Sequence, residues 1–267
     1  MFTEITENNG LVYYRSDNIS CPHGFSTRLG GVSTAPHLRS LNLGENRGDD
    51  PENVVRNYEI FLSALGLNCD TLVSSAQIHS ANVRVVTAAD AGRRFDDCDG
   101  FVTADPGVSL CVKVADCIPI LFSDEKAGII GAVHAGWRGA VSGIASVCVK
   151  KMLSLGAAAE NIQIAIGAGI HPCCYEVGED FAAAVRNIAG EEIFRKHLKP
   201  RGAADKYSAD IVGISRDFIL ECGVPEENIS ECAECTCCSP DKFFSHRYTG
   251  GKRGTMCAVI GIRNAAE

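Results

Sequence analysis

Cys117 and His134 are the two residues whose types and spacing best suit chemistry. Cys117 follows Asp116 in the stretch VADCIPILF, and His134 lies in AVHAGWRG. Two apolar, β-branched runs are separated by the turn-forming residues SDEKAG, so the spacing predicts a strand, a turn and a second strand over 112–139. Such a hairpin would hold a thiol and an imidazole close together, which suits either a metal ion or a nucleophile with its base.

His79 is a further candidate, in the motif QIHSANV within a predicted strand–turn–strand over 72–87. A single histidine in such a place is more often structural, and it gains weight only if the fold brings it to Cys117 and His134. On a regular strand the side chain of Asp116 points away from the face of its neighbour Cys117. We therefore expect Asp116 to support the site as a structural carboxylate rather than to share a ligand with Cys117.

Two arginines lie where an anion could bind. Arg28 precedes two glycines in the polar segment 23–57, which is long enough to suggest a functional loop. Arg138 lies near the expected start of a helix over 140–155, where an anion is favoured. A solvated turn for Arg28 and a surface ion pair for either residue are the alternatives.

The 14 cysteines indicate a reducing environment, because the chain is long and its N-terminus lacks the features of an export signal. Two local groups occur, Cys173-Cys174 and the segment 232–238, which holds four cysteines. The second group is a single local piece with C-x-x-C spacing, whereas a structural zinc site needs four ligands, typically from two such pieces. We therefore do not expect a metal at these cysteines, and their redox role stays open.

Composition restricts the class of protein. The chain has 267 residues, 46% of them hydrophobic, and a net charge of −8, which disfavours a nucleic-acid partner. No apolar run is long enough to span a bilayer, so we expect a cytoplasmic protein without a membrane partner. With no internal repeat and no clear linker, we treat residues 1–267 as a single domain.

The remaining pattern predicts mixed α and β structure. A helix over 50–66 is indicated by Asp50 as N-cap, Pro51 as first residue and apolar residues at 3–4 residue spacing. A second helix is expected over 208–223, and residues 190–208 are interpreted as a charged excursion. Edge strands are expected within 1–20 and further strands over 162–170 and 255–262.

Several short stretches together resemble one known family. It is the YfiH-like family of laccase-domain purine nucleoside phosphorylases, also described as of the multicopper polyphenol oxidase type or as peptidoglycan editing factors. The matching stretches occur in the order of the family and span residues 24–262: GFSTRLGGVS with SLNLG, QIHSANV, VKVADCIPILF, AVHAGWRG, IGAGIHPCCYEVG and CTCCSPDKFFSHR.

This resemblance implies an α+β fold, a single-domain α/β/β/α sandwich similar to that of a putative cysteine-hydrolase superfamily. It also implies that His79, Cys117 and His134 are the metal ligands and the catalytic residues. Zinc is the usual metal of the family, and copper with a laccase activity has also been assigned to it. One departure occurs at 167–169, which reads Gly-Ala-Gly where many relatives carry proline, and it bears on the rim of the pocket.

The activities that the resemblance implies are phosphorolysis of adenosine, inosine and methylthioadenosine, and deamination of adenosine. The partners would be a purine nucleoside and phosphate, with Arg28, Arg138 and Arg247 as phosphate-binding candidates and Asn42 as a contact to ribose or phosphate. The alternative is a hydrolase with a Cys117–His134 dyad, acting on peptidoglycan precursors. The physiological substrate and the oligomeric state stay open.

Zinc fits the expected ligands better than copper oxidation does. Two imidazoles, one thiolate and an open position are typical of a catalytic zinc. A multicopper oxidase needs a blue copper site and a trinuclear cluster, and the seven histidines of the chain do not supply their ligands.

Overall fold

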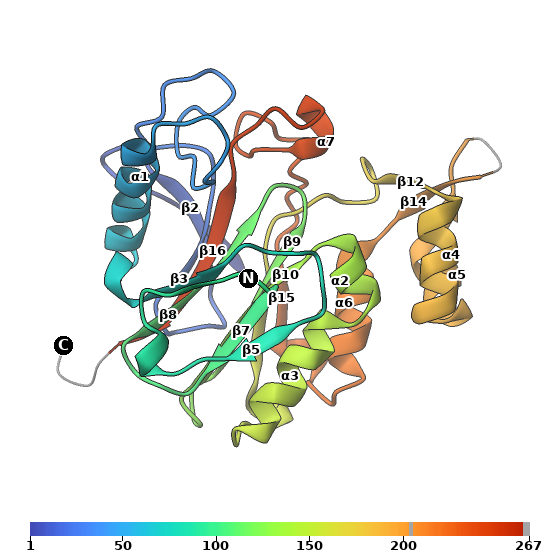
Figure 1. Ribbon diagram of the computed structural model, residues 1–267. Helices are drawn as coiled ribbons and strands as arrows, with labels where there is room; N and C mark the ends of the chain where they lie inside the picture. Colours follow the sequence, from blue (N-terminus) through green and yellow to red (C-terminus); the bar gives the residue numbers. More distant parts are fainter. Residues whose placement is uncertain (203–204, 264–267) are drawn as a thin grey trace.

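The fold is built on two mixed β-sheets that pack face to face, with helices on both outer faces (Figure 1). It is described by a computed structural model for residues 1–202 and 205–263. Helix α1 covers the outer face of the first sheet, and α2, α3 and α6 cover the outer face of the second. The expected α+β architecture with α/β/β/α layers is confirmed.

The elements of each layer are as follows. The seven-stranded sheet has the order β1 (Phe2–Thr6), β2 (Val12–Ser16), β3 (His23–Ser26), β16 (Met256–Ile262), β8 (Val108–Val114), β4 (Leu72–Ser75) and β6 (Arg94–Phe95). The six-stranded sheet has the order β15 (Ile229–Glu231), β11 (Gln163–Ile166), β9 (Ile118–Asp124), β10 (Ile129–Ala135), β7 (Gly100–Thr103) and β5 (Val83–Val85). The main helices are α1 (Pro51–Ala64), α2 (Trp137–Val141), α3 (Ile144–Ser154), α4 (Glu179–Ile188), α5 (Glu191–His197), α6 (Ile211–Leu220) and α7 (His246–Thr249).

Alternation along the strands explains the layers, because successive side chains point to opposite faces of a sheet. In β9, Ile120 and Phe122 pack towards α3 and α6, whereas Leu121 packs between the sheets. In β16, Ala258 lies between the sheets and Val259 packs towards α1. Each central strand therefore contributes to two cores.

The segment around Cys117 differs from the prediction. The apolar run 112–122 is not one strand, because β8 ends at Val114 in the first sheet and β9 begins at Ile118 in the second. Residues 115–117 cross between the sheets, and Asp116 takes a φ of 86° to make the turn. The predicted hairpin is present as β9 and β10, with Pro119 opposite His134.

The predicted helices are largely present. The carboxylate of Asp50 accepts the N–H of Glu52 at the start of α1, as expected for an N-cap. The helix expected over 140–155 is interrupted at Gly143, whose φ is 72°, and so becomes α2 and α3. The interpretation of 190–208 as an excursion was wrong, since it holds α5 and the strands β13 (Leu198–Pro200) and β14 (Lys206–Ala209).

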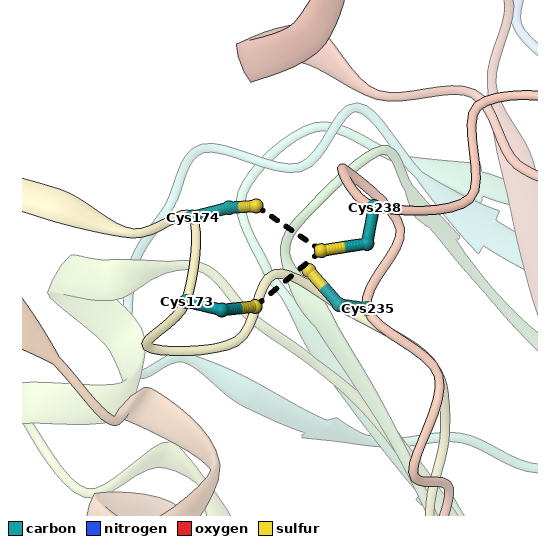
Figure 2. Close-up of side chains that lie close together, drawn as sticks. All are labelled: Cys173, Cys174, Cys235 and Cys238. Atoms are coloured by element: carbon teal, nitrogen blue, oxygen red, sulfur yellow. Dashed lines mark hydrogen bonds between the residues drawn. The ribbon is translucent and has the colours of Figure 1, made fainter.

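Two loops that are far apart in the sequence meet beside the end of β11. Gly169 forms a parallel bridge with Cys235, and the N–H of Thr236 donates to the carbonyl of Gly169 (3.0 Å). This contact brings together four cysteines from the two loops, as Figure 2 shows.

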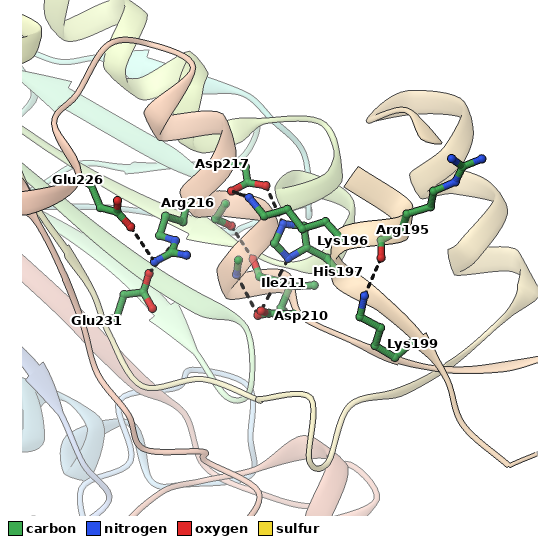
Figure 3. A network of polar contacts seen from close by, with 12 residues as sticks. Arg195, Lys196, His197, Lys199, Asp210, Ile211, Arg216, Asp217, Glu226 and Glu231 are labelled. Carbon is green, nitrogen blue, oxygen red and sulfur yellow. Dashed lines mark hydrogen bonds and ion pairs between the residues drawn. The ribbon is translucent and has the colours of Figure 1, made fainter. Parts of the chain in front are cut away.

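A small lobe extends from the sandwich, made of α4, α5 and the three-stranded sheet β12 (Glu176–Gly178), β14 and β13 (Figure 1). A polar network joins it to α6, as Figure 3 shows. Asp217 on α6 accepts a hydrogen bond from Lys196 (2.7 Å) and contacts the Nε2 of His197 (2.7 Å). Within the described ranges, no helix combines the length and apolar character needed to cross a bilayer.

Candidate active site

His79, Cys117 and His134 come together, although they belong to three separate segments. His79 follows β4, Cys117 lies in the crossover from β8 to β9, and His134 lies near the end of β10. Their ligand atoms all lie within 4.8 Å of one another, and the two imidazole rings meet edge to face with centroids 4.8 Å apart. We call these residues the three-ligand site.

Asp99 holds the imidazole of His134 and the backbone of His79, and the sequence analysis did not single it out. Its buried carboxylate contacts the Nδ1 of His134 (2.9 Å) and accepts the N–H groups of His79 (2.9 Å) and Ser80 (2.7 Å). Burial opposes ionisation of Asp99, but the hydrogen bonds from His134 and Ser80 prevail and lower its pKa to about 2. Asp99 is therefore a fixed negative charge behind the site. Its signal in the sequence was only its place before the strand 100–103.

The protonation of the two histidines follows from these contacts. Burial works against protonation of His134, but Cys117 and Asp99 outweigh it and raise the His134 pKa to about 9. Because Nδ1 faces Asp99, Nε2 is the atom left for Cys117 or for a metal ion. Burial and then the neighbouring His134 lower the pKa of His79, which favours its neutral, metal-binding form.

The backbone around the histidines is shaped for their close approach. His79 adopts a φ of 59°, which non-glycine residues rarely take, and the hydrogen bonds from its own N–H and that of Ser80 to Asp99 hold it there. A Cβ at Gly136 would lie 2.5 Å from the Nδ1 of His79. The glycine of the HAGWRG motif therefore leaves the space that the His79 ring fills.

The three-ligand site opens into a cleft with a volume of about 250 Å³. The wall of this cleft also carries basic side chains that sequence reasoning missed: Arg47, Arg94, Lys113 and Arg253. Arg94 and Lys113 share the carboxylate of Glu45. The signal for these residues was weak, since most lie in loops or at strand ends whose side-chain directions no periodicity predicts.

Arg253 is a partly buried cation of this wall, and no carboxylate pairs with it among the described residues. Its Nη1 donates to the carbonyl of Gly254 (3.0 Å) and the hydroxyl of Thr255 (2.9 Å), while its buried Nε lacks a partner among the described residues. Burial and then the charge of Arg47 lower its pKa to about 10, so it remains protonated at neutral pH. An anion in the cleft would relieve both the orphaned donor and the repulsion.

Arg28 and Asn42 do not line this cleft. The guanidinium of Arg28 donates to the carbonyls of Arg39 (2.9 Å) and Pro240 (2.7 Å). The amide of Asn42 is fully buried and bonded to Gly44, Asp49 and Thr255. Both residues hold the loop 27–50 in place.

Arg138 and Arg247 both lie close to Tyr175. The Arg138 guanidinium stacks over the neighbouring Trp137, 4.2 Å from the ring centroid, and its charge lowers the pKa of His79 after the larger effects of burial and His134. Arg247 donates from its guanidinium to the carbonyls of Cys174 (3.0 Å) and Glu176 (3.0 Å). Arg138 therefore lies within electrostatic reach of the three-ligand site, whereas Arg247 is engaged by backbone.

Asp116 has the structural position expected of it. Its carboxylate accepts the hydroxyl of Thr236 (2.6 Å) and the N–H of Arg247 (2.7 Å). It thereby fastens the C-terminal loops to the crossover that carries Cys117. Asp116 takes this position because of its turn, and not because of the strand alternation on which the prediction rested.

The donor set of the three-ligand site fits a metal ion. Two imidazole nitrogens and one sulfur converge, with the Nδ1 of one imidazole held by a carboxylate, an arrangement common behind metal-binding histidines. The cleft occupies the remaining side, where a substrate or water could take a fourth position.

Comparisons with known proteins agree with this architecture. Residues 22–263 match the family model described as multi-copper polyphenol oxidoreductase laccase. A protein of Deinococcus radiodurans named purine nucleoside phosphorylase is 39% identical over 95% of this chain and 94% of its own length. Adenosine deaminase RL5, from an unknown prokaryotic organism, is 32% identical over 86% of this chain and 90% of its own length.

The solved structures give the same result for the fold. The crystal structure of Bacillus licheniformis hypothetical protein YfiH superimposes with a TM-score of 0.90 at 28% identity, covering 97% of this chain and 99% of that one. With matching sequence motifs, matching layers and the three-ligand site in place, the chain belongs to the YfiH-like, laccase-domain family.

Proposed function

We propose that this protein is a zinc-dependent purine nucleoside enzyme that phosphorolyses adenosine, inosine and methylthioadenosine and deaminates adenosine. The observation that carries the proposal is the three-ligand site facing a cleft whose wall holds Arg253, a cation whose buried Nε lacks a partner among the described residues. Relatives named purine nucleoside phosphorylase and adenosine deaminase support the substrate class.

Zinc is favoured by the donors. Two nitrogens and one sulfur with an open position suit zinc, and the described residues gather one histidine-containing group rather than the several that multicopper oxidation needs. Bound there, zinc would supply Lewis acidity and a water molecule acidified towards a pKa of about 7.

The residues of the chain have separate tasks in this proposal. Arg253, with Arg47 beside it, holds phosphate in the cleft through charge-assisted hydrogen bonds. Arg138 offers a further positive charge from the side of Tyr175. Asp99 holds the backbone of His79 and the Nδ1 of His134, which leaves Nε2 of His134 free to bind the metal.

A cysteine hydrolase is the second candidate, and one observation favours it. Cys117, His134 and Asp99 form a line in which the thiol and the carboxylate both raise the pKa of the imidazole, as in a nucleophile–base–orienter arrangement. A cysteine hydrolase of this kind would give His79 no chemical role, although an unusual backbone conformation holds His79 beside Cys117 and His134.

The deciding experiment measures release of hypoxanthine from inosine with and without phosphate, before and after chelation. We expect base release only with phosphate, and loss of activity on chelation with recovery on adding zinc. Equal turnover without phosphate would refute phosphorolysis. An activity that survives chelation and is abolished by iodoacetamide would establish the hydrolase instead.

A further inference from the structure

We propose that Cys173, Cys174, Cys235 and Cys238 form a second, structural metal site that binds one zinc ion through four sulfur atoms. Neither the family resemblance nor the comparisons assign a role to these residues. We call them the four-cysteine cluster. The proposal goes beyond the nucleoside activity and does not depend on it.

The positions of the sulfur atoms carry the proposal. All four lie within 4.8 Å of one another, and Cys238 lies 3.5 Å from Cys173 and 3.3 Å from Cys174 (Figure 2). Four sulfurs bound to one zinc at about 2.3 Å would be spaced by about 3.8 Å at the corners of a tetrahedron. In a cluster of several irons, cysteines bound to different irons would lie further apart than this.

The local backbone brings the sulfurs to one point. Cys235 and Cys238 belong to a C-x-x-C turn in which the N–H of Cys238 donates to the carbonyl of Cys235 (3.1 Å). The adjacent pair comes from a second turn, in which the N–H groups of Cys174 and Tyr175 donate to the carbonyl of His171. The two turns are aligned by the bridge from Gly169 to Cys235.

One sulfur of the four-cysteine cluster has a backbone hydrogen-bond donor. The N–H of His171 points at the sulfur of Cys235 (3.4 Å). Donors of this kind stabilise the charge of a metal-bound sulfur.

Two guanidinium groups lie beside the adjacent cysteines. Arg201 donates to the carbonyl of Cys173 (3.1 Å), and Arg247 donates to the carbonyl of Cys174 (3.0 Å). Four thiolates and one Zn²⁺ leave an excess of negative charge, which these two cations offset. Each thiol would release its proton to the solvent as its sulfur binds the metal, so no oxidant or reductant is needed.

Such a metal would act as a clamp on the active site. It would join the segments 169–175 and 235–239, and the second of these continues through Thr236 to the carboxylate of Asp116. Asp116 also accepts the N–H of Arg247 and directly precedes Cys117. The clamp would therefore fix the loop that fastens the crossover between the sheets.

The test uses a Cys117→Ala variant, which removes the three-ligand site and leaves the cluster intact. Purified under reducing conditions without added metal, it should contain about one zinc per chain, whereas the unaltered protein should contain about two. After exchange for Co²⁺, the variant should show sulfur-to-cobalt charge-transfer absorption and the visible bands of a tetrahedral site. A folded variant that takes up neither zinc nor cobalt would overturn the proposal, whatever the nucleoside assays give.

Matched variants in the Cys117→Ala background test the ligand assignment. Cys238→Ser should abolish the cobalt spectrum, Cys238→His should retain tetrahedral binding, and Cys237→Ser, which changes the neighbouring thiol, should leave the spectrum intact. Equal loss in Cys237→Ser and Cys238→Ser would refute this ligand set. If Cys238→Ser does not fold, the cobalt spectrum of the parent variant still decides whether the site exists.

The proposed clamp is tested separately, by the stability of the protein with and without zinc. Removing zinc from the Cys117→Ala variant should lower its melting temperature by roughly 5 °C or more and speed hydrogen exchange in 169–175 and 232–247. No change in either quantity would refute the clamp. A count of free thiols that falls by two under reducing purification would point to a disulfide and overturn the metal site.

Discussion

The three-ligand site and the four-cysteine cluster place similar donor atoms under opposite constraints. The first gathers two imidazoles and one thiol and leaves a side open to a cleft. The second gathers four sulfurs, which would fill all four positions of a tetrahedral metal ion by themselves. The number of donors, and not their softness alone, separates a site that can admit substrate from one that can only hold the chain together.

The charged groups beside the two sites also differ, because they have opposite signs. Asp99 places a buried negative charge behind the two histidines, where it holds the imidazole of His134 and the backbone of His79. Arg201 and Arg247 place positive charges beside the cysteine pair, which suits thiolates. Each site therefore has the outer charge that its own ligands require.

The largest effect should come from Cys117→Ala. We expect nucleoside turnover to fall by more than about 100-fold, because removing a ligand should cost more than removing a group that merely orients one. Turnover assays combined with elemental analysis would check this. Full activity in a variant that has lost the metal of the three-ligand site would erase the contrast between the two sites.

Asp99→Asn should weaken metal binding at the three-ligand site by about 10- to 100-fold, because the charge behind His134 is lost. Competition with a zinc indicator dye would measure the affinity. Asp97→Asn is the matched control, since Asp97 is exposed and pairs with Arg84 at the surface. Equal weakening in both variants would show that Asp99 has no special role.

Arg253→Ala should raise the KM for phosphate by about 10- to 100-fold, because charge-assisted hydrogen bonds contribute about 1.5–3 kcal/mol each. Initial rates at varied phosphate and saturating inosine would measure it. Arg28→Ala serves as the comparison. It should lower thermal stability, because Arg28 binds two backbone carbonyls, and leave the KM for phosphate near that of the unaltered protein.

Asp217→Asn should have the smallest effect, at a polar network without a metal. The pKa of Asp217 is lowered: burial acts against this, but hydrogen bonds from His197 and Lys196 prevail. A lowered pKa stabilises the fold above the ordinary carboxyl value of about 3.9, and this stabilisation is lost as the pH falls through the folded-state pKa.

Urea unfolding would test this directly. At pH 7 the variant should lose about 1–3 kcal/mol of unfolding free energy, and the difference should shrink as the pH falls below the ordinary carboxyl value of about 3.9 and through the lowered folded-state pKa. Asp180→Asn, an exposed change on α4, should alter stability by less than about 0.5 kcal/mol. If a chelator abolished the difference in unfolding free energy between the Asp217→Asn variant and the unaltered protein, the network would depend on a metal.

The sequence predicted the positions of the helices and strands better than it predicted which of them pair or pack together. Apolar runs located β9, β10 and β16, and the cap at Asp50 located the start of α1. The run around Cys117 was misread because a chain that crosses between sheets keeps its apolar character on both sides of the turn. Only the backbone of Asp116, with its positive φ, separates the two strands.

The site was predictable to the extent that motifs carry it. The resemblance supplied His79 beside Cys117 and His134, and the structure brings the three together. Asp99 and Arg253 were missed because their roles depend on contacts across the fold. The two cysteine groups were judged separately, since nothing local shows that a bridge at Gly169 aligns them.

The crossover at 115–117 also determines when the three-ligand site can exist during folding. Two of its ligands lie in connections that leave the first sheet, and the third lies in a strand of the second. No short stretch of nascent chain contains all three, so capture of the metal must wait until the two sheets have docked. Under the proposed function, metal binding at this site would therefore require the two sheets to have assembled, and a chain stalled with its sheets apart would be inactive even where zinc is plentiful.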